Sequence, residues 1–254
     1  EFSYDLKATE LSNRKKILSV KNLSRTGDYK NISFDLREGE ILGITGLLGS
    51  GRTELALSLF GMNPPDEGEI KLEGKSLALK SNREAIDNGI AYVSEDRLTL
   101  GLILEQPIAA NAIVTILDKL IAAFGLIPHN ARETTVDRWV KDLSIKVSNT
   151  ANPVKTLSGG NQQRVVLAKW MATNPRVLIL DSPTVGVDIL AKDGIYEIVR
   201  GLAQKGVAII MISDEIPEVL YHSHRILVMR NGRLTGEFEP HKSSEDQLRV
   251  AVNA

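Results

Sequence analysis

The stretch Gly46-Leu47-Leu48-Gly49-Ser50-Gly51-Arg52-Thr53 decides the fold that this sequence predicts. It follows the apolar segment Ile41–Thr45, which we expect to be a buried strand, and precedes Glu54–Phe60, which we expect to be a helix. Such a glycine-rich turn lets the backbone curl until several N–H groups point at one anion. The following helix adds its positive N-terminal end, so the stretch predicts a phosphate-binding loop.

The stretch matches the pattern G-x-x-x-x-G-K-[S/T] except at the lysine, which is Arg52 in this chain. Arginine keeps the positive charge but replaces a compact ammonium by a planar fork. Thr53 would offer its hydroxyl to Mg²⁺. An ordinary glycine-rich turn between a strand and a helix is the alternative interpretation. The candidate nucleotide-binding residues are Gly46, Leu48, Gly49, Ser50, Gly51, Arg52, Thr53 and Glu54.

Two further motifs lie downstream. Leu157-Ser158-Gly159-Gly160-Asn161-Gln162-Gln163-Arg164 predicts a turn entering a helix, with Ser158 as a possible N-cap. Val177-Leu178-Ile179-Leu180-Asp181-Ser182-Pro183-Thr184 predicts a buried strand that ends in an acidic residue. Ligands bind at this end of strands in open parallel sheets, so Asp181 is a candidate metal ligand. A strand ending in a turn that Asp181 caps is the alternative.

The rest of the chain alternates short apolar segments with helical ones, as in a mainly parallel α/β sheet. From about Thr99 to Val165 the helical pattern dominates, including Ala131–Leu143 with Val136 and Val140 on one face. The turn signal Pro64–Gly68 precedes one strand, and a further helix is expected at Ile189–Ala203. The expected strands are Ile17–Val20, Ile32–Leu36, Ile41–Thr45, Glu69–Leu72, Ile90–Val93, Val177–Leu180, Val207–Ile212 and Arg225–Met229.

Composition excludes several classes of protein. Of 254 residues, 43% are hydrophobic and 25% charged, which is typical of a globular chain. The net charge of −1 gives no sign of a bulk nucleic-acid binder, and the absence of cysteine excludes a disulfide scaffold and a thiol nucleophile. The apolar runs Ile108–Leu117 and Leu120–Ile127 are too short to cross a bilayer, so a role at a membrane would need a partner.

The three motifs in this order resemble the nucleotide-binding domain of ABC transporters, from Ile17 to about Phe238. LSGGNQQ is a specific form of that family's signature motif. The resemblance implies a P-loop NTPase (RecA-like) α/β core with an antiparallel β subdomain and a helical subdomain. We therefore expect a linker at 1–16, core segments at 17–98 and 166–238, a helical subdomain at 99–165 and a C-terminal tail at 239–254.

Gly51–Glu54, Ser94–Arg97 and the signature look more specifically like the C-terminal ATP-binding domain of bacterial simple-sugar importers, in which two such domains share one polypeptide. The polar start at Glu1 agrees with a cut from a longer chain, or with a trimmed one. The resemblance implies ATP and Mg²⁺ as cofactors, with Thr53, Asp181 and Glu95 as the Mg²⁺ ligands. It implies a second ATPase domain, a permease and indirectly a sugar-binding protein as partners, no nucleic acid, and a place at the cytoplasmic face of the inner membrane.

Three positions depart from the hydrolysing members of that family. Ser182 stands at the usual glutamate, Glu95 at the usual glutamine and Asp214 at the usual histidine. Serine cannot act as a base at neutral pH, and loss of a general base costs roughly 10²- to 10⁴-fold in rate. We expect this domain to bind Mg-ATP but to hydrolyse it weakly or not at all.

The signature, by contrast, is intact. By the resemblance, it would complete the ATP site of the partner domain through Leu157, Ser158, Gly159, Gly160, Asn161 and Gln162. Asp188, in Val185–Asp188, would lie in the loop that crosses the interface; as an alternative or in addition, it would cap the following helix.

Three other residues are assigned structural roles. Tyr29 is the nearest aromatic that could stack on adenine, but packing is the expected role, and His222 and His224 are expected at the surface rather than as a metal pair.

Two alternative functions remain for the chain as a whole. They are a soluble ABC protein of translation or DNA metabolism and a regulatory nucleotide-binding module.

Overall fold

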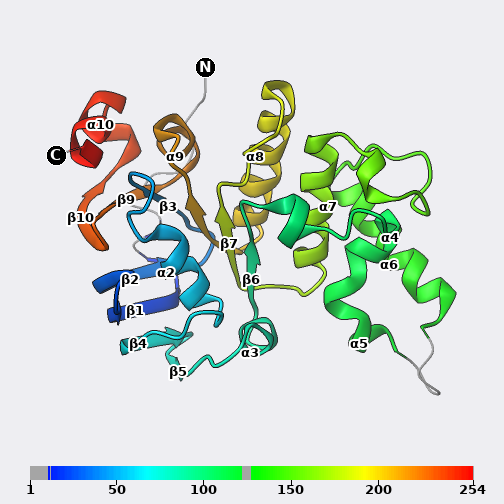
Figure 1. Cartoon of the computed structure of the whole chain (residues 1–254), viewed down its shortest axis with the longest axis horizontal. Helices are drawn as coiled ribbons and strands as arrows, with labels where there is room; N and C mark the ends of the chain where they lie inside the picture. Colours follow the sequence, from blue (N-terminus) through cyan, green and yellow to red (C-terminus); the bar gives the residue numbers. More distant parts are fainter. Residues whose placement is uncertain (1–10, 12, 122–126, 254) are drawn as a thin grey trace. The chain divides into compact units, whose positions relative to one another are not determined.

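A computed structural model describes residues 11, 13–121 and 127–253, with the side chains of His129 and Ala131 left out (Figure 1). The expected linker at 1–16 and the run at 120–127 therefore lie partly outside the described residues. The described chain forms two compact units. The first contains the residues up to Tyr92, 176–183 and those from Arg200 onward; the second contains Val93–Pro175 and Thr184–Val199.

A six-stranded sheet has the order β10-β9-β3-β8-β7-β6. Strands β9, β3, β8 and β7 are parallel, and β10 pairs antiparallel with β9 at one edge. Every residue of β3, β7 and β8 is buried, which explains their uninterrupted apolar sequences. The bounds are β3 (Ile41–Thr45), β6 (Ile90–Val93), β7 (Val177–Asp181), β8 (Ala208–Ile212), β9 (Arg225–Arg230) and β10 (Arg233–Phe238).

A second, antiparallel sheet of four strands belongs to the first unit and has the order β2-β1-β4-β5 (blue to cyan in Figure 1). Its strands are β1 (Lys16–Arg25), β2 (Tyr29–Arg37), β4 (Glu67–Leu72) and β5 (Lys75–Leu77). Buried and exposed residues alternate along much of β2. The predicted combination of a mainly parallel α/β core with an antiparallel β subdomain is confirmed.

Helices of the second unit form the predicted helical segment. Val136 of α6 packs with Ala109, Ile113 and Ile116, and Val140 flanks the same cluster, as the helical face predicted. Helices in this unit are α4 (Ile108–Ile113), α5 (Leu117–Leu120), α6 (His129–Asp142) and α7 (Gly159–Met171), and η1 (Arg97–Gly101) is a single π-helical turn. The remaining helices are α2 (Arg52–Leu59), α3 (Asn82–Asp87), α8 (Ile189–Gln204), α9 (Ile216–His222) and α10 (Glu245–Asn253).

Strand and helix bounds differ from the prediction in a few places. Glu67 and Gly68, predicted in a turn, already belong to β4, and β1 runs on to Arg25. The strands β5 and β10 and the helix α10 are additional elements. Burial in α10 is confined to Leu248 and Val252, so its sequence carries little apolar signal. No helix within the described ranges is both long and apolar enough to span a membrane.

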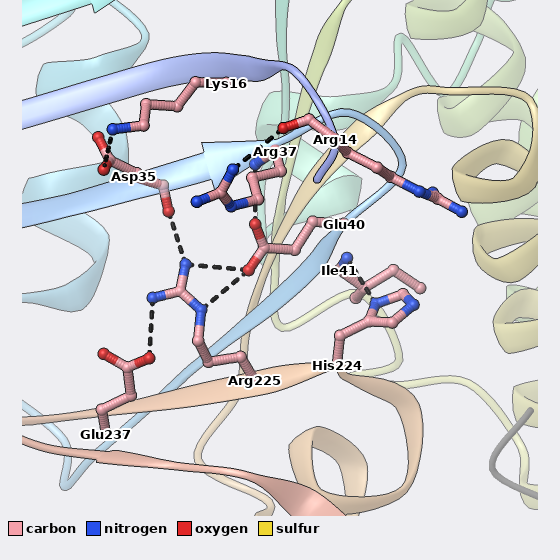
Figure 2. A network of polar contacts seen from close by, with 9 residues as sticks. All are labelled: Arg14, Lys16, Asp35, Arg37, Glu40, Ile41, His224, Arg225 and Glu237. Carbon is pink, nitrogen blue, oxygen red and sulfur yellow. Dashed lines mark hydrogen bonds and ion pairs between the residues drawn. The ribbon is translucent and has the colours of Figure 1, made fainter. Parts of the chain in front are cut away.

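The prediction that His222 and His224 lie at the surface is wrong. Both side chains are buried, because His222 ends α9 and His224 directly precedes β9, whose central residues belong to the buried core. The Nδ1 atom of His224 accepts a hydrogen bond of 2.8 Å from the backbone N–H of Ile41, at the start of β3 (Figure 2). Burial, with a smaller contribution from the charge of Arg14, lowers the pKa of His224 to about 4. His222 lies 3.2 Å from Arg200 through its Nδ1 atom.

An ion-pair network beside His224 joins β9 to β2 and to the turn before β3. Figure 2 shows the Arg225 guanidinium between the carboxylates of Glu40 and Glu237. Its Nε donates to Glu40 Oε1 at 3.0 Å, Nη1 to Glu237 at 3.1 Å and Nη2 to the carbonyl of Asp35 at 2.6 Å. Burial alone would lower the pKa of Arg225, but the two carboxylates raise it. This network connects β2 of the antiparallel sheet to β9 and β10 of the six-stranded sheet.

Candidate nucleotide-binding site

The predicted phosphate-binding loop connects β3 to α2, as its sequence requires. Gly46 has no room for a side chain, since a Cβ there would lie 2.1 Å from the carbonyl oxygen of Met229. Gly51 has φ of 94°, a left-handed conformation that other residues adopt only with strain, and it forms the N-cap of α2. The loop backbone therefore has the curled form that sequence analysis predicted.

Two features of the loop fit an oxygen-rich anion. No side-chain hydrogen bond caps the N-terminus of α2 within the described part of the chain, and the first N–H groups of a helix have no intrahelical acceptor. The hydroxyl of Ser50 is buried, and it finds no hydrogen-bond partner among the described residues. Phosphate oxygens would satisfy both kinds of donor.

Arg52 does not extend into solvent at the lysine position of the motif. Its side chain is 8% exposed, and Nη2 donates a long hydrogen bond of 3.4 Å to the carbonyl of Leu47. The guanidinium thus braces the loop from within, while Leu48 at the tip is fully exposed. Thr53 is half-buried in the first turn of α2.

The carboxyl ends of three parallel strands meet at the same edge of the sheet as this loop. Ile212 at the end of β8 pairs with Ile44 of β3 and with Asp181 of β7. Two backbone hydrogen bonds continue beyond the strands, from Ser213 N–H to Ile44 at 3.1 Å and from Ser182 N–H to Ile212 at 2.8 Å. The first unit therefore brings together the loop, Asp181, Ser182 and Asp214.

Asp181 is 1% exposed and accepts a hydrogen bond of 3.0 Å from the hydroxyl of Tyr92. Carboxylate and hydroxyl oxygens are preferred ligands of Mg²⁺, which also keeps water and phosphate oxygens in its shell. In residues 11, 13–121 and 127–253 no group of three or more histidine, aspartate or glutamate side chains could hold a metal ion by itself. The residues present fit a Mg²⁺ ion that Thr53 and Asp181 would hold together with phosphate oxygens.

Ser182 and Asp214 differ in their surroundings. Ser182 is 9% exposed and adopts a left-handed backbone with φ of 47°, a conformation that costs a non-glycine residue about 1 kcal/mol or more. Asp214 is exposed, and it precedes Glu215, whose N–H donates to the Ser213 hydroxyl at 3.1 Å. Ser182 supplies a hydroxyl and Asp214 an acceptor when ionised.

A cavity of about 590 Å³ opens beside the loop, entirely within the first unit. Gly49 of the loop lines it together with Arg25, which donates from Nε to Asp28 at 2.7 Å and from Nη1 to the carbonyl of Pro64 at 2.7 Å. Tyr29 also lines the cavity, but it is 3% exposed, and burial raises its pKa, as expected for a packing role. Arg25 carries no motif that sequence reasoning could have used.

The second unit holds the signature. Ser158 occupies the N-cap position of α7, as predicted, but its side chain makes no capping hydrogen bond within the described residues. Its Oγ accepts instead from Asn161 Nδ2 at 3.1 Å, and Gln162 Nε2 donates to the carbonyl of Leu157 at 3.2 Å. A Cβ at Gly160 would lie 2.6 Å from the side chain of Ala191 on α8.

Two further predicted residues belong to the second unit. Glu95 is exposed just after β6. Asp188 is also exposed, and its Oδ1 accepts a hydrogen bond of 3.0 Å from the N–H of Ala191 in the first turn of α8. The predicted capping role of Asp188 is confirmed.

Comparisons with known proteins agree on one family. A family model described as "ABC transporter" matches residues 29–185. The chain is 47% identical over 222 residues to the ribose import ATP-binding protein RbsA of Geobacillus kaustophilus, covering 87% of this chain and 45% of that protein. It is 44% identical to the protein of the same name from Rhodococcus jostii, covering 93% of this chain and 47% of the relative. The chain thus spans about half the length of these relatives.

Solved structures support the same fold. An ATP-binding cassette of an ABC transporter in its ADP conformation superposes with a TM-score of 0.73 at 23% identity, covering 94% of this chain and 95% of the other. A dimeric bacterial ABC transporter cassette gives a TM-score of 0.75 at 21% identity, covering 88% of this chain and 99% of the other.

Proposed function

The chain belongs to the ABC transporter family, and from this premise we propose that it is an ATP-binding, energy-coupling domain of a bacterial sugar importer. The names of its relatives support import of ribose or a similar simple sugar. The observation that carries the proposal is the loop at Gly46–Thr53. This loop contains the buried hydroxyl of Ser50, which has no hydrogen-bond partner among the described residues, and it leads into the N-terminus of α2, which no described side chain caps. The loop lies at the same edge of the sheet as Asp181.

Each residue of the loop has a defined task in this proposal. The backbone N–H groups of Gly49 to Thr53 and the Ser50 hydroxyl donate to phosphate oxygens, and Arg52 holds the loop in shape. Thr53 and Asp181 hold Mg²⁺, which neutralises charge on the phosphates when bound.

The base and ribose of the nucleotide fit the cavity beside Gly49. The Arg25 guanidinium is held there on two sides by Asp28 and the Pro64 carbonyl, so its flat face is fixed. A planar cation of this kind stacks on an aromatic base by cation–π attraction. Arg25, rather than Tyr29, is therefore the platform for the base.

Hydrolysis at this domain's own site is weak or absent. Ser182 offers no general base, and Asp214 is acceptor-only when ionised and would repel a γ-phosphate. Glu95 adds further negative charge at the position of a glutamine. The domain holds one ATP almost statically, as one half of an asymmetric pair.

The intact signature serves the other half of that pair. Ser158, Gly159 and Gly160, with the N-terminus of α7, complete the ATP site of a second ATPase domain, which the double length of the relatives supports as part of the same polypeptide. Asp188 and its loop cross the interface.

A permease is the membrane partner in this proposal. Three apolar side chains within six residues, Leu98, Leu100 and Ile103, are 47%, 71% and 53% exposed in the second unit. Apolar side chains gathered in this way at a surface are typical of a docking site. The chain would then work at the cytoplasmic face of the inner membrane, with a sugar-binding protein as an indirect partner and no nucleic acid.

Titration of the chain with ATP, with and without Mg²⁺, tests the proposal. We expect saturable binding that Mg²⁺ strengthens. Ser50→Ala should weaken binding because it removes a donor to phosphate, and Thr53→Ala should reduce the effect of Mg²⁺. Ser243→Ala, at a half-buried position far from the loop in sequence, is the matched control for a lost hydroxyl. Absence of ATP binding would overturn the proposal.

A further inference from the structure

Arg97 is a buried arginine that the proposed function leaves without a role. It opens η1 in the second unit, two residues after Glu95, and its side chain is 8% exposed. Nη1 donates to the carbonyl of Val185 at 2.6 Å and Nη2 to the carbonyl of Gly186 at 2.8 Å. These two carbonyls belong to the loop Val185–Asp188, which is 88 or more residues away in sequence.

Within the described residues, the Arg97 guanidinium donates its hydrogen bonds to backbone carbonyls alone. Within the described chain no carboxylate forms an ion pair with it, its Nε finds no acceptor, and burial lowers its pKa. A buried cation is costly unless it is hydrogen-bonded, so the two carbonyls of the loop have to stay in place to satisfy it. Charge-assisted hydrogen bonds of this kind are about twice as strong as neutral ones.

A third element meets the same guanidinium. A Cβ at Gly159, the first residue of α7, would lie 2.8 Å from the Gly186 carbonyl oxygen and 3.0 Å from Arg97 Nη2. The signature therefore packs against both the guanidinium and the loop, and only glycine fits. Gly186 itself has φ of 65° and leaves 3.2 Å between a Cβ and Arg97 Nη2. The side chain of Arg97 thus lies where η1, the loop and the start of α7 meet.

We propose that Arg97 is a positioning residue that fixes the loop Val185–Asp188 and the signature as one unit. The two elements would then meet the partner ATPase domain together, a consequence that rests on the proposed function. Two parallel bonds from a planar fork fix both the position and the rotation of the loop. A lysine ammonium is a compact charge without this fork of donors, so it cannot donate two parallel hydrogen bonds to both carbonyls in the same way.

Hydrogen exchange in the chain itself tests the positioning role. The reporter amides are those of Val187, which donates to Thr184, and Ala191, which donates to Asp188. We expect exchange to be roughly tenfold faster in Arg97→Met and to rise less in Arg97→Lys, because a tenfold change corresponds to about one lost hydrogen bond. Arg97→Lys keeps the charge, so it decides the matter if Arg97→Met does not fold.

Lys169→Met is the matched control. Lys169 is also a buried cation of the second unit, and its Nζ donates to the carbonyl of Gly101 at 2.6 Å, at the far end of η1. Loss of its charge should leave the exchange of Val187 and Ala191 unchanged. Wild-type exchange at these amides in Arg97→Met, or equal acceleration in Lys169→Met, would overturn the inference.

A second measurement links Arg97 to the partner. In the chain paired with its partner ATPase domain, Arg97→Lys should lower kcat roughly 10- to 100-fold, as expected for misplacement of a catalytic element. The affinity of this chain's own phosphate-binding loop for Mg-ATP should not change. A loss of affinity in place of kcat, or an equal loss of kcat in Lys169→Met, would contradict the role. If wild-type protein neither binds ATP nor supports its partner, the proposed function fails while the exchange result still decides the role of Arg97.

Discussion

In the proposed function, Arg25 contacts the base of the nucleotide, so substituting Arg25 distinguishes binding of a nucleotide from binding of phosphate groups alone. Arg25→Ala should weaken ATP affinity roughly two- to fivefold, because it removes a cation–π contact of about 0.5–1 kcal/mol with the base. Affinity for inorganic tripolyphosphate, which has no base, should stay the same. Calorimetric titration of both ligands measures the difference. Arg83→Ala, which removes an exposed arginine paired with Asp87, is the control, and equal losses for both ligands would exclude a base contact.

His224 gives the protein a pH dependence with a definite sign. Its pKa is about 4 in the folded protein and near 6.5 in an unfolded chain, so the unfolded chain binds the extra proton between these values. The free energy of unfolding should therefore be fully retained above pH 6.5 and fall as the pH drops from 6.5 to 4, by no more than about 3 kcal/mol.

Urea unfolding at several pH values checks this expectation. His224→Asn keeps an acceptor for the Ile41 N–H but cannot titrate, so its stability should vary less over that range. His241→Gln, at an exposed position beside Glu239, should keep the wild-type dependence. A wild-type pH dependence in His224→Asn would mean that other groups cause it.

At the scale of elements, the ion-pair network of Arg225 joins β9 to β2 and to the turn before β3. Arg225→Met should lower the free energy of unfolding by about 3 kcal/mol, because the carboxylate of Glu40, which is 2% exposed, would remain buried without its cation. Urea denaturation measures the loss. Arg249→Met on α10 breaks an exposed pair with Glu245 and should cost at most about 0.5 kcal/mol. Similar losses in the two variants would contradict the buried network.

The elements that sequence analysis placed best are those whose signal is local. The bounds of β3 and β6 were predicted correctly because each is a fully buried apolar run that ends at a polar or glycine-rich turn. The strand β10 escaped prediction because it is an edge strand with alternating half-exposed residues. His224 was misplaced because its partner, Ile41, is 183 residues away.

In the candidate site, too, residues with a local sequence signal were predicted, and residues that act through distant partners were not. Gly46–Thr53 and Asp181 lie in short continuous motifs that can be identified in the sequence, and the fold brings them to one edge of the sheet. Arg25 and Arg97 act through partners that are 39 and 88 residues away in the chain, and neither lies at a motif position whose contacts can be inferred. Physical contact across such separations depends on the whole topology.

At the scale of the whole molecule, the central feature of the proposed function is an asymmetry within one chain. The signature motif is intact in the sequence, whereas we propose that Ser182 and Asp214 stand in place of the groups that hydrolysis at this chain's own loop would need. Ser158→Arg should therefore abolish the ATP turnover of the partner domain, since a bulky cation would occupy the position that faces the partner's γ-phosphate. ATP affinity of this chain's own loop should be unchanged. Steady-state ATPase assays of the pair, with Ser243→Arg as control, measure the effect, and an unaffected pair would exclude the signature from catalysis.

Single-turnover hydrolysis by this chain alone tests the central claim most directly. Radiolabelled Mg-ATP is bound to an excess of the chain, and the appearance of inorganic phosphate is followed over time. We predict that ATP stays bound and intact, with phosphate release roughly 10²- to 10⁴-fold slower than in an ABC ATPase domain that has the usual glutamate. Rapid conversion of the bound ATP to ADP and phosphate would contradict the account.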